Sequence, residues 1–219
     1  NLSLVPSTAL FLSSLIIDGA KVTSDTQYTF SNVTAAHTIR ATFAPNSFTI
    51  TSSAGLHGTI APTPSVFVSN GASQHFSIAP ATGYHVDSLI IDGAKVTSDT
   101  QYTFTNVTAN HAIRVTFAIN SYTITSSAGA HGTITPTPSV NMNYGSSQHF
   151  SIAPATGYRV DSLIIDGVKV TSDTQYTFNS VSSNHTIRVT FVINNMTVTT
   201  TVIGGGTITP SGSVQVPYG

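Results

Sequence analysis

The sequence predicts an all-β protein built as a tandem array of small β-sandwich-like repeat domains. The stretch SLIIDGAKVTSDTQYTF begins at Ser14 and returns at Ser88 and, with one change, at Ser162, so its copies start 74 residues apart. A fixed period of this size is the signature of a repeat architecture. Within each period, apolar and polar side chains alternate with the spacing of two that is typical of half-buried strands.

The period also sets the expected domain boundaries. Phe48–Ser121 and Tyr122–Asn195 are identical at about 57 of 74 positions. A unit of this size can bury a modest core of its own. The expected domains are the C-terminal two thirds of a repeat at 1–46, complete repeats at 47–120 and 121–194, and the N-terminal third of a repeat at 195–219.

The strands and turns inside a repeat follow from local pattern. Ile113, Val115 and Phe117 alternate with polar residues, and similar short runs give six or seven expected strands in each repeat. Asp92-Gly93 and Asn70-Gly71 are both predicted to form two-residue hairpins, because such dipeptides suit a primed turn with positive φ. Glycine and proline interrupt too often for long helices. A β-grasp variant with one short helix remains the alternative.

Composition excludes several classes of partner. Only 7% of residues are charged and the formal net charge is -1. The sequence has no basic stripe of the kind that nucleic acids or anionic membranes require. It has no cysteine, which excludes disulfides and thiolate metal sites, and no apolar run of about 18 residues that would insert into a membrane as a helix.

No catalytic, cofactor-binding or metal-binding residues are predicted, and we expect neither a cofactor nor an enzyme. Asp92 is assigned to its hairpin turn, and Asp99 to a turn in which its carboxylate accepts nearby backbone N–H groups. No Gly-x-Ser-x-Gly elbow is present. The histidines that recur in phase fall in different turns and strands without metal-ligand spacing; these are His37, His111 and His185, His57 and His131, and His75 and His149.

Two recurring patterns concern covalent modification. Lys21, Lys95 and Lys169 repeat in phase with Asn46, Asn120 and Asn194, as an internal Lys–Asn cross-link would require; otherwise each lysine keeps the edge beside its hairpin soluble. Glycosylation sequons begin at Asn32, Asn106, Asn184 and Asn195, and such motifs arise easily by chance in a chain rich in serine and threonine.

Several motifs resemble the divergent InlB-B-type repeats of bacterial surface and secreted proteins. They are the Ser-Ala-Gly…Gly-Thr-Ile opening, Gly157-Tyr158, Asp166-Gly167, Tyr176-Thr-Phe178 and Asn184-His-Thr-Ile187…Phe191. The resemblance covers essentially the whole chain, but its motifs are turns and core aromatics. It implies an extracellular, cell-surface setting and the role of a stalk, adhesin or filament module.

The two incomplete repeats together make one repeat less three turn residues. One interpretation is that an array was trimmed and the phase of its ends has no meaning. The other is that residues 195–219 complete residues 1–46 of a neighbouring copy by β-strand addition, a head-to-tail contact that builds a filament. The expected function is therefore a secreted structural repeat protein that assembles with itself. The alternative is a stalk or adhesin that binds glycans or a surface partner, with Tyr144 as its best exposed aromatic and with Tyr84, Tyr102 and Phe104 in the core.

Overall fold

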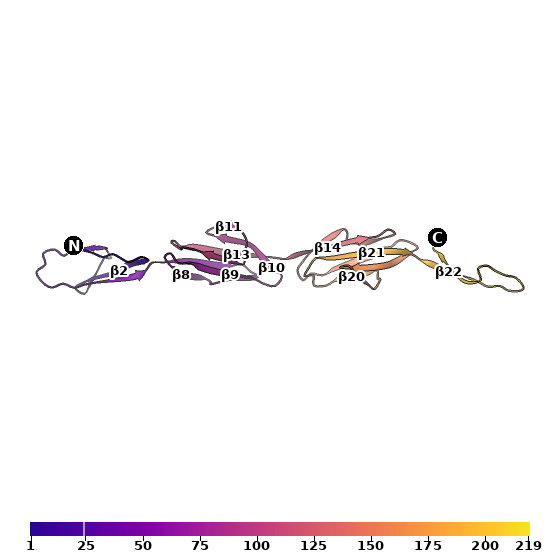
Figure 1. Cartoon of the computed structure of the whole chain (residues 1–219), viewed down its shortest axis with the longest axis horizontal. Coiled ribbons are helices and arrows are strands. Elements are labelled where there is room, and N and C mark those ends of the chain that lie inside the picture. The colour runs from indigo at the N-terminus through magenta and orange to yellow at the C-terminus, as the bar shows by residue number, and fades with distance from the viewer. Residues whose placement is uncertain (24) are drawn as a thin grey trace. The chain divides into compact units, whose positions relative to one another are not determined.

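The structure, a computed structural model, describes residues 1–23 and 25–219. It divides into two compact units, Asn1–Ala118 and Ile119–Gly219. Every regular element among the described residues is a β-strand, as Figure 1 shows. The described part of the chain accordingly contains no helix that could span a membrane.

The first complete repeat has eight strands, where six or seven were predicted. They form a five-stranded sheet of order β11-β10-β13-β6-β8 and a three-stranded sheet of order β12-β9-β7. The strands are β6 (Ser47–Ala54), β7 (Gly58–Ala61), β8 (Ser65–Ser69), β9 (Gln74–Pro80), β10 (Tyr84–Ile91), β11 (Ala94–Val96), β12 (Gln101–Phe104) and β13 (His111–Ile119).

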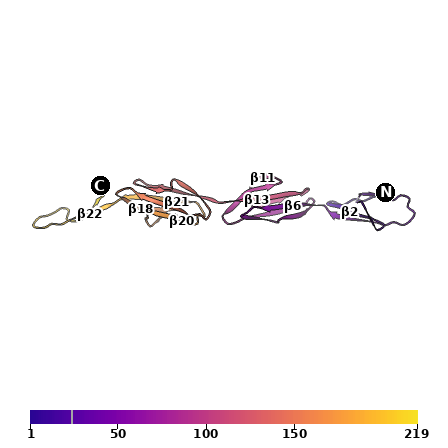
Figure 2. The ribbon, with the colours of Figure 1, turned by 180° about the vertical axis from the view of Figure 1, so that it is seen from behind.

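The first and last strands of this repeat lie side by side. β6 and β13, both labelled in Figure 2, pair in parallel. Ile113 lies opposite Ser52 and Val115 lies opposite Ala54. β6 also pairs with β8 in antiparallel fashion. The large sheet is therefore continuous only when both ends of the repeat are in place, a long-range pairing that the local sequence pattern did not predict.

The core lies between the two sheets, as a sandwich requires. Ile50, Leu89 and Val115 from the large sheet and Phe76 from the small sheet are fully buried, and Phe104 packs in the same cluster. The predicted sandwich-like, all-β fold is thus confirmed. The β-grasp alternative requires a short helix, and residues 1–23 and 25–219 contain none.

The second complete repeat has the same topology. Its sheets have the orders β16-β14-β21-β18-β19 and β15-β17-β20, and β14 pairs in parallel with β21. The strands are β14 (Ser121–Ala128), β15 (Gly132–Thr135), β16 (Ser139–Asn143), β17 (Gln148–Pro154), β18 (Tyr158–Ile165), β19 (Val168–Val170), β20 (Gln175–Phe178) and β21 (His185–Ile193).

Residues 1–46, the N-terminal part-repeat, contain only part of each sheet. Their two sheets have the orders β3-β2-β5 and β1-β4, over a small core of Leu12, Leu15 and Ile17. The strands are β1 (Leu2–Ser3), β2 (Leu10–Ile17), β3 (Ala20–Val22), β4 (Gln27–Tyr28) and β5 (Ile39–Pro45).

Residues 195–219, the C-terminal part-repeat, form one antiparallel pair. β22 (Asn195–Thr200) pairs with β23 (Gly212–Pro217). These two strands correspond to β6 and β8 of the first complete repeat, shifted by two periods.

The two predicted hairpins had different outcomes. Asp92-Gly93 joins β10 to β11, with Ile91 opposite Ala94 and φ values of 49° and 84° at the two turn residues, so this prediction is confirmed. The Asn70-Gly71 hairpin is wrong, because β8 and β9 belong to different sheets. This segment is a crossover, in which the N–H of Gly71 donates to the carbonyl of Val107 at 2.8 Å.

The position of the core generates a first prediction. Phe76→Ala should lower the free energy of unfolding of its repeat by about 3–5 kcal/mol, because it removes a fully buried ring and leaves a cavity. Phe67→Ala is the matched control, since Phe67 is 77% exposed and should change stability by less than about 0.5 kcal/mol. Urea unfolding of both variants measures the difference, and equal effects would contradict the assigned core.

Candidate functional site

The most regular polar cluster is an aspartate–histidine pair that occurs three times. In the first complete repeat, Oδ2 of Asp92 lies 2.7 Å from Nδ1 of His111, and Oδ1 accepts the backbone N–H of Ala112 at 2.8 Å. Because a carboxylate can only accept, Nδ1 of His111 carries the proton. The pair ties the β10–β11 turn to the first residues of β13. The other copies are Asp18 with His37 and Asp166 with His185, each at 2.7 Å.

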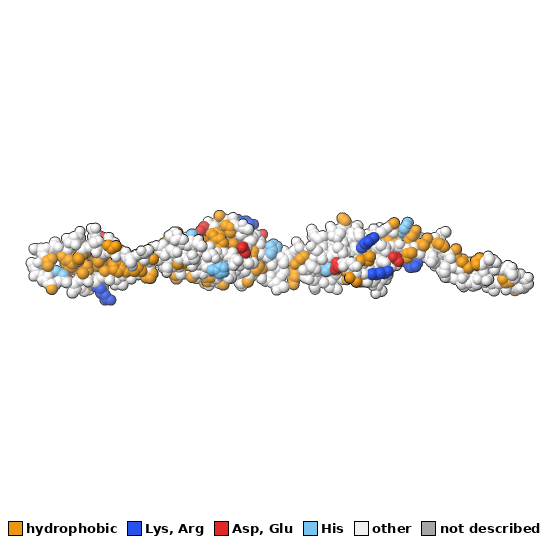
Figure 3. All heavy atoms as spheres, viewed as in Figure 1, with side chains coloured by type: hydrophobic (Ala, Val, Ile, Leu, Met, Phe, Trp, Pro, Cys, Tyr) orange, Lys and Arg blue, Asp and Glu red, His pale blue; other side chains and the backbone are white. Residues whose placement is uncertain are grey.

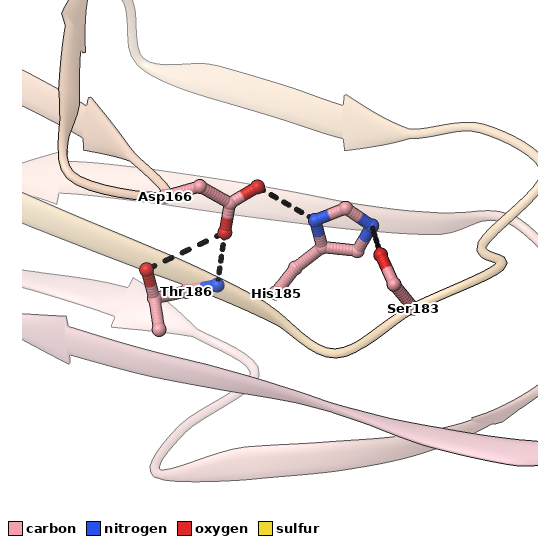
Figure 4. A network of polar contacts seen from close by, with 4 residues as sticks. All are labelled: Asp166, Ser183, His185 and Thr186. Carbon is pink, nitrogen blue, oxygen red and sulfur yellow. Dashed lines mark hydrogen bonds and ion pairs between the residues drawn. The ribbon is translucent and has the colours of Figure 1, made fainter.

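The copy in the second complete repeat includes a serine (Figure 4). Nε2 of His185 lies 3.4 Å from Oγ of Ser183, while Asp166 binds the other ring nitrogen and the N–H of Thr186. These are the residue types of a hydrolase triad. However, alanine occupies the position of Ser183 in the other two copies, at Ala35 and Ala109. The role common to all three copies is therefore to hold the turn, and it does not need the serine.

The carboxylates of these pairs have lowered pKa values. The pKa of Asp92 lies below its ordinary value because the N–H of Ala112, and then His111, donate hydrogen bonds to the charged form, against a smaller effect of burial. The pKa of Asp18 is lowered by Thr38 and His37 in the same way. At Asp166 partial burial raises the pKa, but the hydrogen bonds from His185 and Thr186 outweigh it.

The pKa of Asp92 has a consequence for stability. Since its pKa is lower in the folded protein than in the unfolded chain, the pair stabilises the fold at pH values above the ordinary value of 3.8. That contribution is lost as the pH falls through the folded-state pKa. We expect Asp92→Asn to lower the free energy of unfolding at pH 7 by about 1 kcal/mol.

The measurement is the urea midpoint at pH 7 and at pH 3. The wild-type midpoint should fall more than that of Asp92→Asn, because the variant has already lost the titrating group. Asp99→Asn removes the same charge from an exposed turn, where Oδ1 accepts the N–H and hydroxyl of Thr100, and serves as the control. An equal fall for wild type and Asp92→Asn would show that the pair does not contribute.

Backbone hydrogen bonds hold the single-residue linkers between repeats. Between β22 and β21, the N–H of Asn194 donates to Gly157 at 2.7 Å, and its carbonyl accepts from Tyr218 at 2.8 Å. The ring of Tyr218 covers Gly157, where a Cβ would lie 2.2 Å from the ring and where φ is +83°. The corresponding linker, Asn46, makes the same two bonds with Ala9 and Asn70. At the Asn46 linker, Ala9 occupies the position of Gly157, and the smaller Asn70 occupies the position of Tyr218.

Both part-repeats expose side chains that complete repeats bury. Val198 of β22 is 50% exposed, whereas its counterpart Ile50 is 0% exposed. Ile208 is 41% exposed, whereas Ile60 is 3% exposed. In the N-terminal part-repeat, Ile39 of β5 is 37% exposed and its counterpart Ile113 is 1% exposed. Figure 3 shows hydrophobic side chains (orange) along the surface of both part-repeats.

The same segments have unpaired strand edges. Within the described residues, β5 pairs with β2 alone, whereas β13 has a neighbour on each side. β22 likewise pairs with β23 alone, and residues 206–209, which correspond to β7, do not form a strand. Open edges of this kind are templates for pairing with another chain. They make the two part-repeats the best candidate for a binding site.

The other histidines and aromatic residues singled out in the sequence lie apart from one another. His57 and His131 stack on Tyr84 and Tyr158, with ring centroids 4.2 Å apart, so Tyr84 is half-buried against a histidine and is not in the core as predicted. Tyr102 and Phe104 do pack on the core. His75 and His149 each contact a threonine hydroxyl at 3.0 Å. Outside Ser24, no group of three or more potential metal-ligating side chains is present.

Two further expectations are corrected by the structure. The Lys–Asn cross-link is wrong, because Lys21 pairs with Ile16 while Asn46 follows Pro45, which pairs with Leu10. Ile16 and Leu10 are six residues apart on β2, which separates Lys21 from Asn46 by about 20 Å along the strand direction.

Tyr144, expected to be exposed, is half-buried. The carboxylate turn at Asp99 is confirmed by its 2.6 Å bond from the N–H of Thr100.

The sequence pattern did not predict the aspartate–histidine pair, because it holds no specific signal for this contact. The aspartate and histidine are 19 residues apart in all three copies, and both residue types recur in phase. Every pair of positions in a tandem repeat keeps a constant spacing, so this spacing alone does not indicate a contact. The turn alone accounts for the aspartate, so the sequence gives no reason to place the histidine beside it.

Comparison with known proteins gave one family. The family model described as the divergent InlB B-repeat domain matches residues 48–121 and 122–195. Searches of curated proteins and of solved structures gave no match. The two matched stretches cover more than half of the chain and contain both complete sandwiches. The chain therefore belongs to the divergent InlB B-repeat family.

Proposed function

We propose that this chain is a structural, extracellular repeat protein of the bacterial cell surface that assembles head to tail through its two part-repeats. Membership of the InlB-type B-repeat family supports the surface setting and a structural, non-enzymatic role. The assembly is proposed to occur by strand complementation, in which the C-terminal hairpin of one copy completes the N-terminal part-repeat of the next.

The observation that carries this proposal is the parallel pairing of first and last strands in the complete repeats. There the equivalents of β22 lie against the equivalents of β5, with Thr51 opposite Ala112 and Thr125 opposite Thr186. The same register would place Thr199 of one copy opposite Thr38 of the next. If further repeats preceded or followed these residues in one chain, the same ladder would form within that chain. The proposal therefore concerns a polypeptide of these 219 residues.

Apolar burial would provide the driving force. Val198, Ile208 and Ile39 are exposed here, while their counterparts in complete repeats are buried. Fully burying an aliphatic side chain of this size contributes on the order of 1.5–3 kcal/mol. Together with a new backbone ladder, such burial would offset the entropy lost when two chains associate.

The completed joint would be weaker than an internal repeat. Asn110 and Asn184 cap the first strand of each complete repeat by accepting the N–H of Thr49 and of Thr123 at 2.8 and 2.9 Å. Ala36 occupies this position in the N-terminal part-repeat and cannot do so. Ala41 also replaces a core valine, Val115. Under load or dilution, the joint should therefore open before the complete repeats unfold.

The glycan-binding alternative has less support. Its best candidate, Tyr144, is half-buried, and the described aromatic pairs are histidine–tyrosine stacks or core contacts. Exposed apolar strands at two complementary ends favour a protein partner, and specifically another copy of this chain.

The proposal predicts that the purified chain forms concentration-dependent oligomers, visible as regular fibres by negative-stain electron microscopy and as species of rising mass by light scattering. Deletion of 195–219 should leave a monomer, because the edge of β5 then has no complement. Added peptide 195–219 should cap the full-length chain and shorten the fibres. A full-length chain that stays monomeric at every concentration would refute the assembly, while leaving the family assignment intact.

A further inference from the structure

A glycine and a phenylalanine ring fit together at the same point of both complete repeats. A Cβ on Gly58 would lie 2.3 Å from Cζ of Phe117, and a Cβ on Gly132 would lie 2.2 Å from Cζ of Phe191. The glycine begins the edge strand of the small sheet, and the phenylalanine belongs to the last strand of the large sheet. Any side chain on the glycine would therefore displace the ring.

The backbone gives no other reason for the glycine. Gly58 and Gly132 do not have the positive φ that L-residues avoid. An ordinary residue would be sterically acceptable there if the ring were absent. The requirement for glycine comes from the close approach of the aromatic ring.

The N-terminal and C-terminal part-repeats hold the two halves of this contact separately. Gly206 occupies the position of Gly58 and Gly132, yet nothing lies within 4 Å of where its Cβ would be. Phe43 occupies the position of Phe117 and Phe191 and packs half-buried against the small N-terminal core. Within residues 1–23 and 25–219, Gly206 meets none of the steric contacts that make its equivalents glycine.

We infer that Phe43 of one copy seats on Gly206 of the next, and that this contact makes the joint specific for a second copy of the chain. The inference rests on the proposed assembly and identifies its recognition contact. Strand addition alone is sequence-tolerant, because it uses backbone hydrogen bonds, whereas side-chain pockets give such contacts their specificity. The glycine admits the ring, and a larger residue at that position would hold the small sheet away from it.

Neighbouring positions show how selective the contact is. Ile203 occupies the position of Gly55, where a Cβ would find only ordinary contacts of 3.6–3.9 Å, so a side chain can begin there without a clash. Gly205 occupies the position of His57 and His131, so a histidine fits there as well. Of these three neighbouring positions, only the one held by Gly206 lies too close to a ring to admit a Cβ.

The test compares Gly206→Ala and Gly206→Val with Gly205→His in the full-length chain, by light scattering and electron microscopy over a dilution series. Gly206→Ala should weaken assembly by about tenfold or more and Gly206→Val should abolish it, because even a Cβ overpacks the contact. Gly205→His restores the residue of the complete repeats and should assemble like the wild type. The circular dichroism of all three diluted chains should match that of the wild type, because a Cβ on Gly205 or Gly206 would meet no described residue of the separate chain within 4 Å.

Two outcomes separate this inference from the proposed function. If the wild type assembles and Gly206→Val assembles equally well, the glycine–ring contact is wrong while strand complementation stands. If the wild type does not assemble, the proposed function itself fails. Gly132→Val checks the steric rule inside one chain: it should lower the urea midpoint of its repeat, and an unchanged midpoint would overturn the rule on which the inference rests.

Discussion

The structure depends on one pairing, the parallel ladder between the first and last strands of each repeat. β6 and β13, like β14 and β21, are separated by nearly a whole repeat in sequence and are neighbours in the sheet. Without this ladder the large sheet ends at β13, and the core loses the side chains that β6 and β7 contribute. The N-terminal part-repeat shows the result, with three buried apolar residues and an exposed Ile39 where the complete repeat buries Ile113.

The polar contacts reinforce this closure. The aspartate–histidine pair fixes the β10–β11 turn to the start of β13, which is where the parallel ladder begins. The ring of His111 also lies 4.8 Å from that of Phe104, at the edge of the core. Asn46 and Asn194 each use both backbone groups to join a part-repeat to its neighbouring complete repeat. The residues that they bind are alanine with asparagine in the first case and glycine with tyrosine in the second. With few charges available, stability rests on backbone bonds and apolar burial.

Sequence was a good guide to local structure and a poor one to pairing. The Asp92-Gly93 hairpin was predictable because both its strands are adjacent in the chain and the turn dictates positive φ. Asn70-Gly71 carries the same local signal, but the flanking strands β8 and β9 pair in different sheets. Both strands face one core, with Val68 and Phe76 in the same cluster, so the chain crosses from one sheet to the other there and does not form a hairpin. The parallel ladder and the contact between Asp92 and His111 could not be read from local periodicity, because both join residues that only the closed sandwich brings together.

The central claim is that β22 of one copy takes the place beside β5 of another that β6 takes beside β13. The chain contains no cysteine, so a Thr38→Cys, Thr199→Cys variant would place its only thiols opposite each other across the proposed ladder, at a spacing compatible with a disulfide. After mild oxidation, non-reducing electrophoresis should show a ladder of covalent multimers that collapses on reduction. Thr38→Cys with Thr201→Cys, out of register by two residues, should cross-link far less. A predominantly monomeric band, or equal cross-linking of both variants, would contradict the account.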